Sequence, residues 1–460
     1  MVLSPAPDYS SMPESSTTMP RPIMPASISR ERPRQEGVWA HVAPAPRTIA
    51  ECGLPLSLLE ELALKILRSR DRPKLAELAR TMCVHSQLCE LILDGLVRRK
   101  LASIEAADSP LRAHFRFALT DDGKAAADDA MRRCAYSGAA PVPIEQYSQV
   151  VQSQASVRER PSPEQVRSAL DHLVLPELTV DAVGQAYASG RPMMVYGPSG
   201  NGKTDIVVSV ANCIEGSVVV PHALYGQGHI IEVFDAHLHV SVLNPDLENA
   251  DIDRRWREIK RPVAVAGGEM SGDALELSYD AIRNVHVAPL SVRSQGGILV
   301  IDDLGRQRAS LSSILNRWIQ LMENGADTFA LQSSEVITLP LDVTLIFSTN
   351  LVLADLMDEA YLRRISYKIP VPNPTTDAFR EITRRICGNV GLTVDEDTLD
   401  YLVERLYSIR DLEPKACYPR DIVQTVVDYA TYRNQQPRLS VDAVEWALKL
   451  YLGERAQLAS

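Results

Sequence analysis

Hydrophobic residues recur at helical spacing along the first part of this chain. Between residues 57 and 135, apolar side chains follow one another three or four positions apart in four segments, which predicts amphipathic helices. Ser57 and Glu60 match a capping box, so the first helix is predicted to begin there. The run 114–119 alternates like a strand, and a turn is predicted over 121–123. The other helices are predicted over 74–83 and 85–100 and from Lys124.

Short apolar runs replace this pattern in the middle of the chain. From about 163 to 372 they alternate with helical segments, as the parallel sheet of an α/β domain requires. Continuous apolar runs are typical of strands that are buried on both faces. Beyond Pro374 only helical patterns appear, which predicts a small helical lid. Its helices are predicted over 376–388, 397–409, 419–433 and 440–452.

Composition separates these regions from two others. Residues 1–46 are rich in Pro, Ser and Met and show no sustained period, so we predict a disordered tail. The proline-bearing stretch 136–162 is predicted to be a linker with about one helical turn. The predicted organisation is a tail over 1–46, a helical domain over 50–135, a linker over 136–162, an α/β core over 163–372 and a lid over 373–460.

Charge, cysteine content and hydropathy limit the partners and the cellular location that we expect for the protein. The formal net charge of −11 argues against a chain that coats nucleic acid without specificity. The seven cysteines are odd in number and form no close CxxC pair, which favours reduced thiols. No apolar run approaches the roughly 18 residues that a membrane span requires. We therefore expect a cytoplasmic protein without a membrane span.

A glycine-rich segment lies between the apolar run 193–196 and a helical pattern over 205–213. Backbone N–H groups of such a loop turn inward around phosphate oxygens, and the helix N-terminus adds its positive dipole end. We expect Lys203 to reach the β- and γ-phosphates of a nucleotide and Thr204 to bind Mg²⁺. A glycine-rich turn without a ligand is the alternative. The segment matches GxxxxGK[ST] with Gly197, Pro198, Ser199, Gly200, Asn201, Gly202, Lys203 and Thr204.

A second apolar run, 296–301, ends in the carboxylates Asp302 and Asp303. In open α/β sheets, ligands bind outside the carboxyl ends of the strands. Asp302 suits the role of a Mg²⁺ ligand, and Asp303 lies where a water-activating carboxylate belongs. Either acid alone could instead cap the end of a strand.

From about 163 to 455 the order of these motifs resembles that of AAA+ ATPases. The apolar run 343–349 ends at Asn350, which matches the family's sensor 1, a polar group that orients the attacking water. Arg363 and Arg364 lie in a segment similar to the one that supplies arginine fingers to a neighbouring subunit. Arg420 matches sensor 2, which reaches the γ-phosphate from the lid. Taken singly, each arginine could instead be a surface ion-pair partner.

The resemblance implies an enzyme that binds ATP and Mg²⁺ and hydrolyses ATP. It also implies a homo-oligomer, usually a hexameric ring, that remodels a client protein or works with an adaptor. Two strand signals before Asn350, over 328–331 and 336–339, resemble the hairpin of the MoxR-type branch. The region 50–135 resembles a winged helix-turn-helix domain. Its third helix carries Glu90 and Asp94, which disfavour contact with phosphates, but Lys and Arg crowd its C-terminal end.

Two departures from the family pattern affect the expected chemistry. Asp303 stands where the family usually has Glu, so hydrolysis is expected to be slow or the site to act as a switch. Asp302 lies 99 positions after Lys203, which exceeds what the core needs. Extra strands are predicted there over 218–222, 229–234 and 262–266, and 251–260 is a charged segment with Trp256.

Several alternatives remain open at this point. Tyr225 and Gly226 resemble an aromatic pore loop that grips polypeptide, although a hairpin turn over 226–228 also accounts for them. The helical domain over 50–135 favours either protein docking or DNA binding. The function is therefore a remodelling ATPase, a DNA-acting ATPase or transcriptional regulator, or a nucleotide-gated switch with slow hydrolysis.

Overall fold

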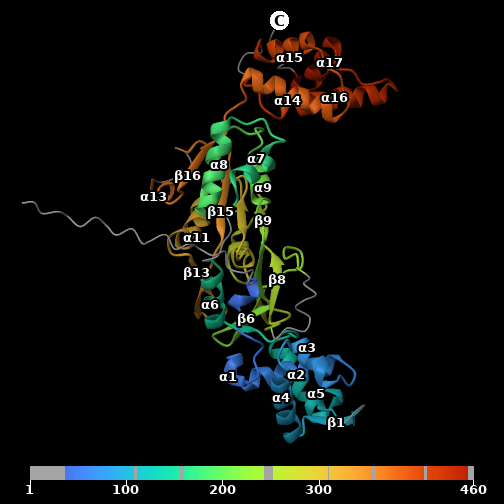
Figure 1. Cartoon of the computed structure of the whole chain (residues 1–460), viewed down its shortest axis with the longest axis vertical. Helices are drawn as coiled ribbons and strands as arrows, with labels where there is room; N and C mark the ends of the chain where they lie inside the picture. The colour runs from blue at the N-terminus through green and yellow to red at the C-terminus, as the bar shows by residue number, and fades with distance from the viewer. Residues whose placement is uncertain are drawn as a thin grey trace, which may run out of the picture. The chain divides into compact units, whose positions relative to one another are not determined.

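The computed structural model (Figure 1) describes residues 37–107, 111–155, 160–242, 252–308, 310–353, 359–408 and 412–453. Residues 1–36 of the predicted tail lie outside this range. The end of the predicted tail is anchored in the structure: a 3₁₀ turn, η1 (Val38–His41), places Trp39 so that its indole N–H donates to Glu258 at 2.8 Å. Residues 38–46 therefore belong to the folded part of the chain.

Helices and one hairpin form the region after η1. It contains the three predicted helices, the predicted strand with a partner strand, and the closing helix, so the pattern of apolar positions is confirmed at the level of elements. Its assignment as a winged helix-turn-helix domain stays a prediction. The elements are α1 (Ile49–Cys52), α2 (Leu56–Ser69), α3 (Leu75–Met82), α4 (Ser86–Arg98), β1 (Ala102–Ala107), η2 (Arg112–His114), β2 (Phe115–Leu119) and α5 (Asp121–Arg133).

Two local predictions in this region are wrong. The capping box fails because α2 begins after Pro55, and the Glu60 carboxylate forms an ion pair with Arg99 at 2.5 Å instead. The turn predicted over 121–123 is the first turn of α5, capped by the hydroxyl of Thr120. A Cβ on Gly123 would lie 1.8 Å from the carbonyl oxygen of Leu101, so this glycine serves close packing rather than a turn.

A five-stranded parallel sheet forms the centre of the chain and confirms the predicted α/β class. Its strand order is β16-β4-β15-β12-β9, and every neighbouring pair is parallel. The strands alternate along the sequence with helices or longer connections, as parallel pairing requires. The strands are β4 (Met193–Tyr196), β9 (Val263–Ala266), β12 (Ile298–Ile301), β15 (Thr344–Thr349) and β16 (Tyr367–Pro370).

Helices cover both faces of this sheet, which explains why its strands are continuous apolar runs. Alternate residues point to opposite faces of a strand. In β4, Met193 and Val195 pack with α7 (Pro163–Leu170), α8 (Glu177–Ser189) and α9 (Lys203–Ala211), which Figure 1 shows beside the sheet. Met194 faces the other core, which contains Trp318 of α11 (Leu311–Asn324).

The predicted linker holds a strand and a helix of three turns. β3 (Val142–Pro143) pairs with β6, and α6 (Ile144–Ala155) buries Tyr147 and Val151 in the main core. The expectation of a single helical turn was too low because the Pro-rich flanks of this segment conceal its helical pattern. The segment is therefore part of the folded body rather than a spacer.

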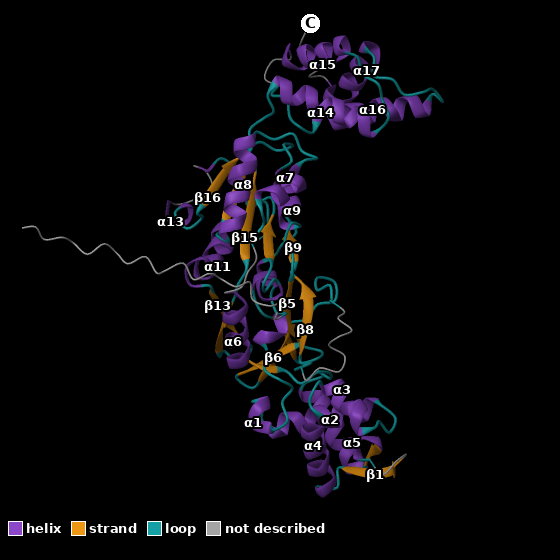
Figure 2. Ribbon diagram, viewed as in Figure 1, coloured by secondary structure: helices purple, strands orange, loops and turns teal. Residues whose placement is uncertain are grey.

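The long segment between Lys203 and Asp302 builds two further sheets (Figure 2). The extra strands predicted over 218–222 and 229–234 are present there as β5 and β7, and the charged segment contains a strand that begins at Trp256. The third predicted extra strand, 262–266, is instead β9 of the central sheet, so it belongs to the core. One sheet pairs β5 (Ser217–Pro221) with β8 (Trp256–Lys260). The other has the order β10-β11-β7-β6-β3. Its members are β6 (Ala223–Gly226), β7 (His229–Glu232), β10 (Ser278–Asp280) and β11 (Val285–Val287), and short helices η4 (Gly272–Leu275) and α10 (Leu290–Arg293) adjoin them.

Tyr225 belongs to the tight hairpin between β6 and β7, as the hairpin alternative predicts. Gln227 and Gly228 have φ angles of 49° and 79°, as a two-residue hairpin turn demands. Tyr225 packs against the hydrophobic cluster of the region around α2–α5, and a Cβ on Gly226 would lie 2.1 Å from the side chain of Ile144. Both residues therefore have a packing role in the fold.

The end of the chain contains a second hairpin and the lid. β13 (Ala326–Ala330) and β14 (Val336–Pro340) form the hairpin predicted before β15. The four predicted lid helices are present, and they have their own hydrophobic core. They are α14 (Thr376–Asn389), α15 (Glu396–Ser408), α16 (Tyr418–Tyr432) and α17 (Val441–Leu452), and a short α13 (Glu359–Leu362) precedes β16.

Candidate nucleotide-binding site

The glycine-rich loop connects β4 to α9, as the motif requires. Gly197 has φ 145°, and a Cβ there would lie 2.2 Å from the carbonyl oxygen of Val371. Gly200 has φ 89°, and a Cβ there would lie 2.7 Å from the sulfur of Cys417 in the lid. Both positions need glycine because any side chain would push the loop away from the chain segments on either side of it.

Lys203 is the first residue of α9 and points back over the loop. Its Nζ donates to the carbonyl oxygen of Pro198 at 2.9 Å, and the residue is buried. Burial lowers the pKa of the ammonium group, while the carboxylates of Asp303 and Asp302 act in the opposite direction. The ammonium is thus held at the mouth of the loop by one carbonyl group that a phosphate oxygen could replace.

Asp302 lies directly beside Thr204. The hydroxyl of Thr204 is 2.8 and 3.0 Å from the two carboxylate oxygens of Asp302. Ser348 of β15 also donates to this carboxylate, and the side-chain amide of Gln307 donates to the Asp302 carbonyl at 2.7 Å. Asp302 is therefore fixed from three sides. The sequence analysis missed Ser348 and Gln307, whose only signal is their closeness to the two strand ends.

Asp303 follows in a left-handed backbone conformation with φ 51°. Its N–H donates to the hydroxyl of Ser348 at 3.5 Å, and the next amide, of Leu304, donates to the Ser348 carbonyl at 2.8 Å. Asp and Asn tolerate this conformation better than other non-glycine residues. This conformation gives a physical reason for a short carboxylate at this position.

A cavity of about 420 Å³ joins the loop to the lid. Asp303 lines it, together with the loop from Ser199 to Asp205 and Arg420 of α16. Two residues that the sequence analysis did not single out, Arg385 and Asn389 of α14, also line it. The remaining lining residues are His172, Leu173, Val174, Leu175, Ile382, Ile386, Ala416 and Cys417.

The cationic side chains of the cavity are held differently from one another. The guanidinium of Arg385 donates to the carbonyl of Asp171 at 2.6 Å, which fixes α14 to the segment before α8. Arg420 is largely exposed and its nearest acidic partner is Asp421 beside it, at 3.3 Å. Arg420 thus lies at the surface of the cavity with the freedom to reach a ligand.

The structure does not bring the other predicted residues into this cavity. Asn350 follows the carboxyl end of β15, between the ends of β4 and β12, but it is not among the lining residues. Arg364 forms an ion pair with Glu323 of α11 at 2.5 Å, whereas Arg363 is exposed. The two arginines, which the sequence treats alike, therefore have different surroundings.

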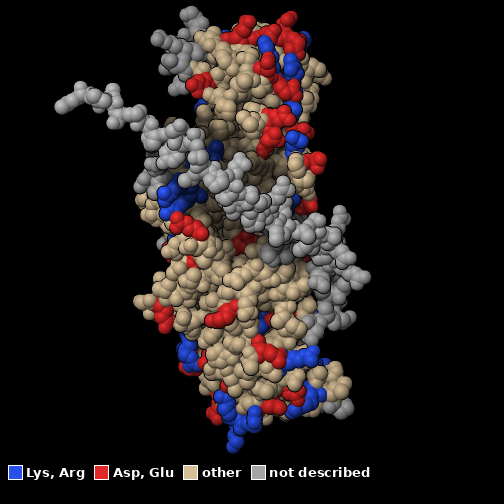
Figure 3. All heavy atoms as spheres, turned by 60° about the vertical axis from the view of Figure 1, so that its left-hand side comes forward, with Lys and Arg blue, Asp and Glu red and all other residues tan. Residues whose placement is uncertain are grey.

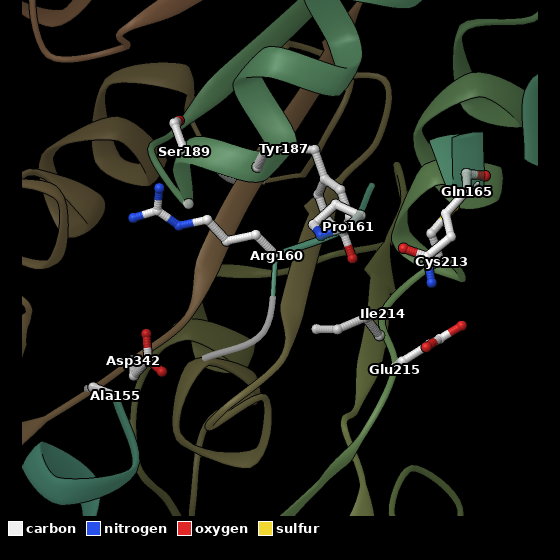
Figure 4. A pocket seen from close by; sticks show the side chains of 12 residues that line it. Ala155, Arg160, Pro161, Gln165, Tyr187, Ser189, Cys213, Ile214, Glu215 and Asp342 are labelled. Carbon is white, nitrogen blue, oxygen red and sulfur yellow. Dashed lines mark hydrogen bonds between the residues drawn. The ribbon is translucent and has the colours of Figure 1, made fainter. Parts of the chain in front are cut away.

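A second cavity of about 320 Å³ lies at the opposite edge of the sheet (Figure 4). Its lining residues Ser189 and Asp342 lie just before β4 and β15, at the end of the sheet where these strands begin, and Glu215 lies just before β5 of the neighbouring two-stranded sheet. Figure 4 shows the side chains of Arg160 and Glu215 pointing in different directions. No motif of the sequence maps to this cavity.

Acidic side chains of the third helix, α4, are neutralised within their own region. Arg112 pairs with both Glu90 and Asp94, the two carboxylates expected to disfavour DNA. Figure 3 shows Lys and Arg side chains interspersed with Asp and Glu side chains over this end of the molecule. The described part of the region therefore presents a mixed surface in this view.

Comparisons with known proteins add little to this geometry. Residues 375–450 match a family model described as a domain of unknown function (DUF8689), which covers less than half of the chain. No curated protein matches the chain. Across the residues that the structure describes, none of the helices has the length and apolar composition of a membrane span.

Two solved structures illustrate the distant likeness. One is the RuvB Holliday junction branch migration motor of Thermotoga maritima, with 14% identity over 60% of this chain and 68% of that chain and a TM-score of 0.36. The other is NtrX from Brucella abortus in complex with ADP, with 14% identity over 69% of this chain and 64% of that chain and a TM-score of 0.37. At these scores neither protein argues for an activity of this chain.

Proposed function

We propose that this chain is an AAA+ ATPase that binds MgATP between the central sheet and the lid. The observation that carries the proposal is the cavity shared by the glycine-rich loop, Asp303 and Arg420. Three regions far apart in the sequence converge there, and each supplies the residue type that phosphoryl transfer uses. Its apolar lining from 173–175 and α14 offers a surface for a nucleobase.

The residues around Thr204 and Asp302 fit a magnesium ion. Mg²⁺ prefers oxygen ligands and is usually held by one or two carboxylates plus waters and phosphates. The Thr204 hydroxyl and the Asp302 carboxylate lie within 3.0 Å of each other and provide such oxygens. Mg²⁺ bound there would neutralise negative charge on the phosphates. Ser348 keeps the carboxylate in place.

The remaining residues take the roles that the family resemblance assigns. Lys203 exchanges the Pro198 carbonyl for phosphate oxygens, and the loop amides surround the phosphate chain. Asp303 accepts a proton from the attacking water, and Asn350 orients that water. Arg420 approaches the γ-phosphate from the lid, and Arg363 or Arg364 acts on the ATP of a neighbouring subunit in a ring, hexameric by resemblance.

A pair of buried lysines tests the proposal. Lys203→Ala should abolish binding of a fluorescent ADP analogue with Mg²⁺, because it removes the compact positive charge of the phosphate cradle. Lys65→Ala is the matched control: Lys65 is also buried and donates to a carbonyl, that of Cys134 at 3.1 Å, far from the site in sequence and in its contacts. Retention of affinity within about threefold in Lys203→Ala, roughly 0.7 kcal/mol, would refute the proposal.

The rival functions differ in measurable ways. A remodelling role with a protein client is favoured over DNA binding because Glu90 and Asp94 already engage the guanidinium of Arg112, and because the face seen in Figure 3 is mixed in charge and not basic. Sub-micromolar binding of duplex DNA by the full chain, with a steep salt dependence, would favour the DNA-acting ATPase. The short carboxylate of Asp303, in its left-handed conformation, supports the alternative of a nucleotide-gated switch with slow hydrolysis. The rate of ATP hydrolysis in a single turnover distinguishes such a switch from a motor.

A further inference from the structure

The tip of the glycine-rich loop is hydrogen-bonded to the lid through a buried side chain. Asn201 is 4% exposed, its Nδ2 donates to Oδ1 of Asn373 at 2.8 Å, and its Oδ1 accepts from the N–H of Ala416 at 3.1 Å. Asn373 lies between β16 and α14, where the sheet passes into the lid, and Ala416 lies just before α16. One side-chain amide thus connects the loop to the start and to the middle of the lid.

Two further hydrogen bonds reinforce this connection, which we call the loop–lid bridge (Asn201, Asn373 and Ala416). The N–H of Cys417 donates to the carbonyl of Gly200 at 2.9 Å, and Nδ2 of Asn373 donates to the carboxylate of Glu413 at 2.7 Å. The sulfur of Cys417 lies so close to Gly200 that no side chain fits between them. The bridge is therefore a packed contact and not a single exposed bond.

The bridge also determines where Arg420 lies. α16 begins at Tyr418, so Arg420 is in its first turn, four residues after Ala416. A helix is rigid on the scale of one turn, and its first turn moves with the residues that fix its N-terminus. A change in the contact between Asn201 and Ala416 therefore moves the guanidinium of Arg420 relative to the loop that holds the phosphates.

We propose that Asn201 is a positioning residue that couples the phosphate loop to the lid and sets the distance from Arg420 to the γ-phosphate. This inference rests on the function proposed above for its link to catalysis, but the bridge exists without nucleotide. A positioning role predicts that loss of the bridge lowers turnover more than ground-state binding, since the loop amides and Lys203 remain in place.

The alkylation rate of the Cys417 sulfur reports how often the loop–lid bridge opens. The full-length chain is treated with iodoacetamide without nucleotide, and the alkylation of each cysteine is followed by peptide mass spectrometry. In Asn201→Ala, Cys417 should react about tenfold faster, the change in the open population expected from losing one or two buried hydrogen bonds. Steady-state assays with MgATP should show kcat lowered about tenfold and KM within about threefold.

Matched variants separate positioning from general damage. Gln154→Ala removes another buried amide that makes two hydrogen bonds, both to Val219, and should leave Cys417 reactivity and kcat unchanged. Asn373 lies outside the loop, so Asn373→Ala breaks the bridge without changing the loop itself. It should reproduce the effects predicted for Asn201→Ala, and it tests the bridge even if Asn201→Ala folds poorly. Asn373→Asp, which can still accept from Asn201, should remain closer to the parent chain.

The outcomes decide the two proposals independently. Unchanged Cys417 reactivity in both Asn201→Ala and Asn373→Ala overturns the bridge, and so does equal acceleration in Gln154→Ala. Faster alkylation with unchanged kcat overturns the coupling to Arg420. If the parent chain binds no MgATP, the proposed function fails, and alkylation still decides the bridge because it needs no nucleotide.

Discussion

Two clusters of buried polar groups join distant parts of this chain, and they differ in how fully their hydrogen bonds are used. In the first, Arg255 is 2% exposed and all three guanidinium nitrogens are bonded. Nε and Nη2 contact Asp253 at 2.7 to 3.0 Å, Nη1 donates to the carbonyl of Cys52 at 3.0 Å, and Nη2 also donates to Gln146 at 2.9 Å. We call this cluster the Arg255 anchor.

The nucleotide site has the opposite character. Lys203 has three donors and, among the described residues, gives one hydrogen bond, to the Pro198 carbonyl. Thr204 and Asp302 bond to each other beside an open cavity of about 420 Å³. The saturated cluster can only hold the fold, whereas the unsaturated one retains polar groups that a ligand can engage. This difference, more than burial or charge, separates the structural cluster from the candidate site.

The largest effect is expected if a neighbouring subunit completes the open site. Arg363→Ala should lower ATP turnover by about 10³ to 10⁵ while ATP still binds, because a finger that stabilises the transferring charge contributes that much. Arg364→Ala should have a smaller effect, since this side chain already pairs with Glu323. Steady-state ATPase assays beside nucleotide-binding assays measure both.

Mixing provides the control for this prediction. Arg363→Ala and Asp303→Asn should each be inactive alone, yet mixed assemblies contain some interfaces with an intact site and an intact finger. Recovered activity on mixing is expected. Absence of recovery despite proven co-assembly would remove Arg363 from the mechanism.

The Arg255 anchor should dominate stability instead of activity. Arg255→Ala leaves Asp253 buried without its partner, so the free energy of unfolding should fall by about 3 to 5 kcal/mol. Urea titration measures this loss. Arg384→Ala, which removes an exposed ion pair with Glu396, should leave stability unchanged. A loss under about 1 kcal/mol in Arg255→Ala would show that the anchor is not needed.

Acid should weaken the same part of the molecule through His222. The backbone N–H of His222 donates to the carbonyl of Arg255 at 3.0 Å, and its ring contacts Phe234. Burial, and secondarily the charge of Arg257, lower the pKa of His222 to about 4 from an ordinary value of 6.5. The unfolded chain takes up this proton first, so stability falls as the pH drops from about 6.5 towards 4.

This loss is expected to be about 1 to 3 kcal/mol, less than the full shift implies because the ring is partly exposed. Urea unfolding of the parent and of His222→Gln between pH 4.5 and 7.5 isolates the contribution. His237→Gln, at an exposed histidine, is the control. Parallel pH profiles for the parent chain and His222→Gln would contradict the prediction.

The smallest effect concerns backbone strain at the nucleotide site. At φ 51°, Asp303→Gly should be as stable as the parent chain or up to about 1 kcal/mol more stable. Asp303→Asn should be as stable as the parent chain. Asp303→Glu should be about 1 kcal/mol less stable, because a longer side chain tolerates this conformation less well. Urea unfolding of the three variants gives the order, and a Glu variant as stable as the Gly variant would exclude strain.

The sequence predicts well those parts of the fold that depend on a pattern of neighbouring residues. The loop from Gly197 to Thr204, the run ending at Asp302 and the lid helices each depend on local spacing, and the structure contains the strand, the hairpin and the helices expected around them. Arg420 lines the cavity, and its role as sensor 2 stays a prediction.

The features that the sequence analysis missed depend on long-range contacts. β3 is two residues long and pairs with β6 about 80 residues later, so no local sequence pattern predicts this strand. Arg255 resembles its neighbours in a charged segment and becomes an anchor only because Cys52 and Gln146 approach it. Pro55 defeats the Ser57 capping box because it sets an earlier start for α2. Asn201 looks like a variable position of the loop until Asn373 and Ala416 are placed beside it.

The hydrophobic cluster around α2–α5 has a consequence for the order in which the chain can fold. Its buried members include Ala223, Ile230 and Val285 from the sheet formed by β6, β7 and β11. Protein synthesis proceeds at about 5 to 20 residues per second. The hydrophobic cluster can therefore be completed only several seconds or more after residues 50–140 have been synthesised, when the last of these side chains leaves the ribosome. A fragment that ends near residue 135 lacks these partners permanently and exposes the apolar surface that they cover, so binding experiments on this region need the full chain.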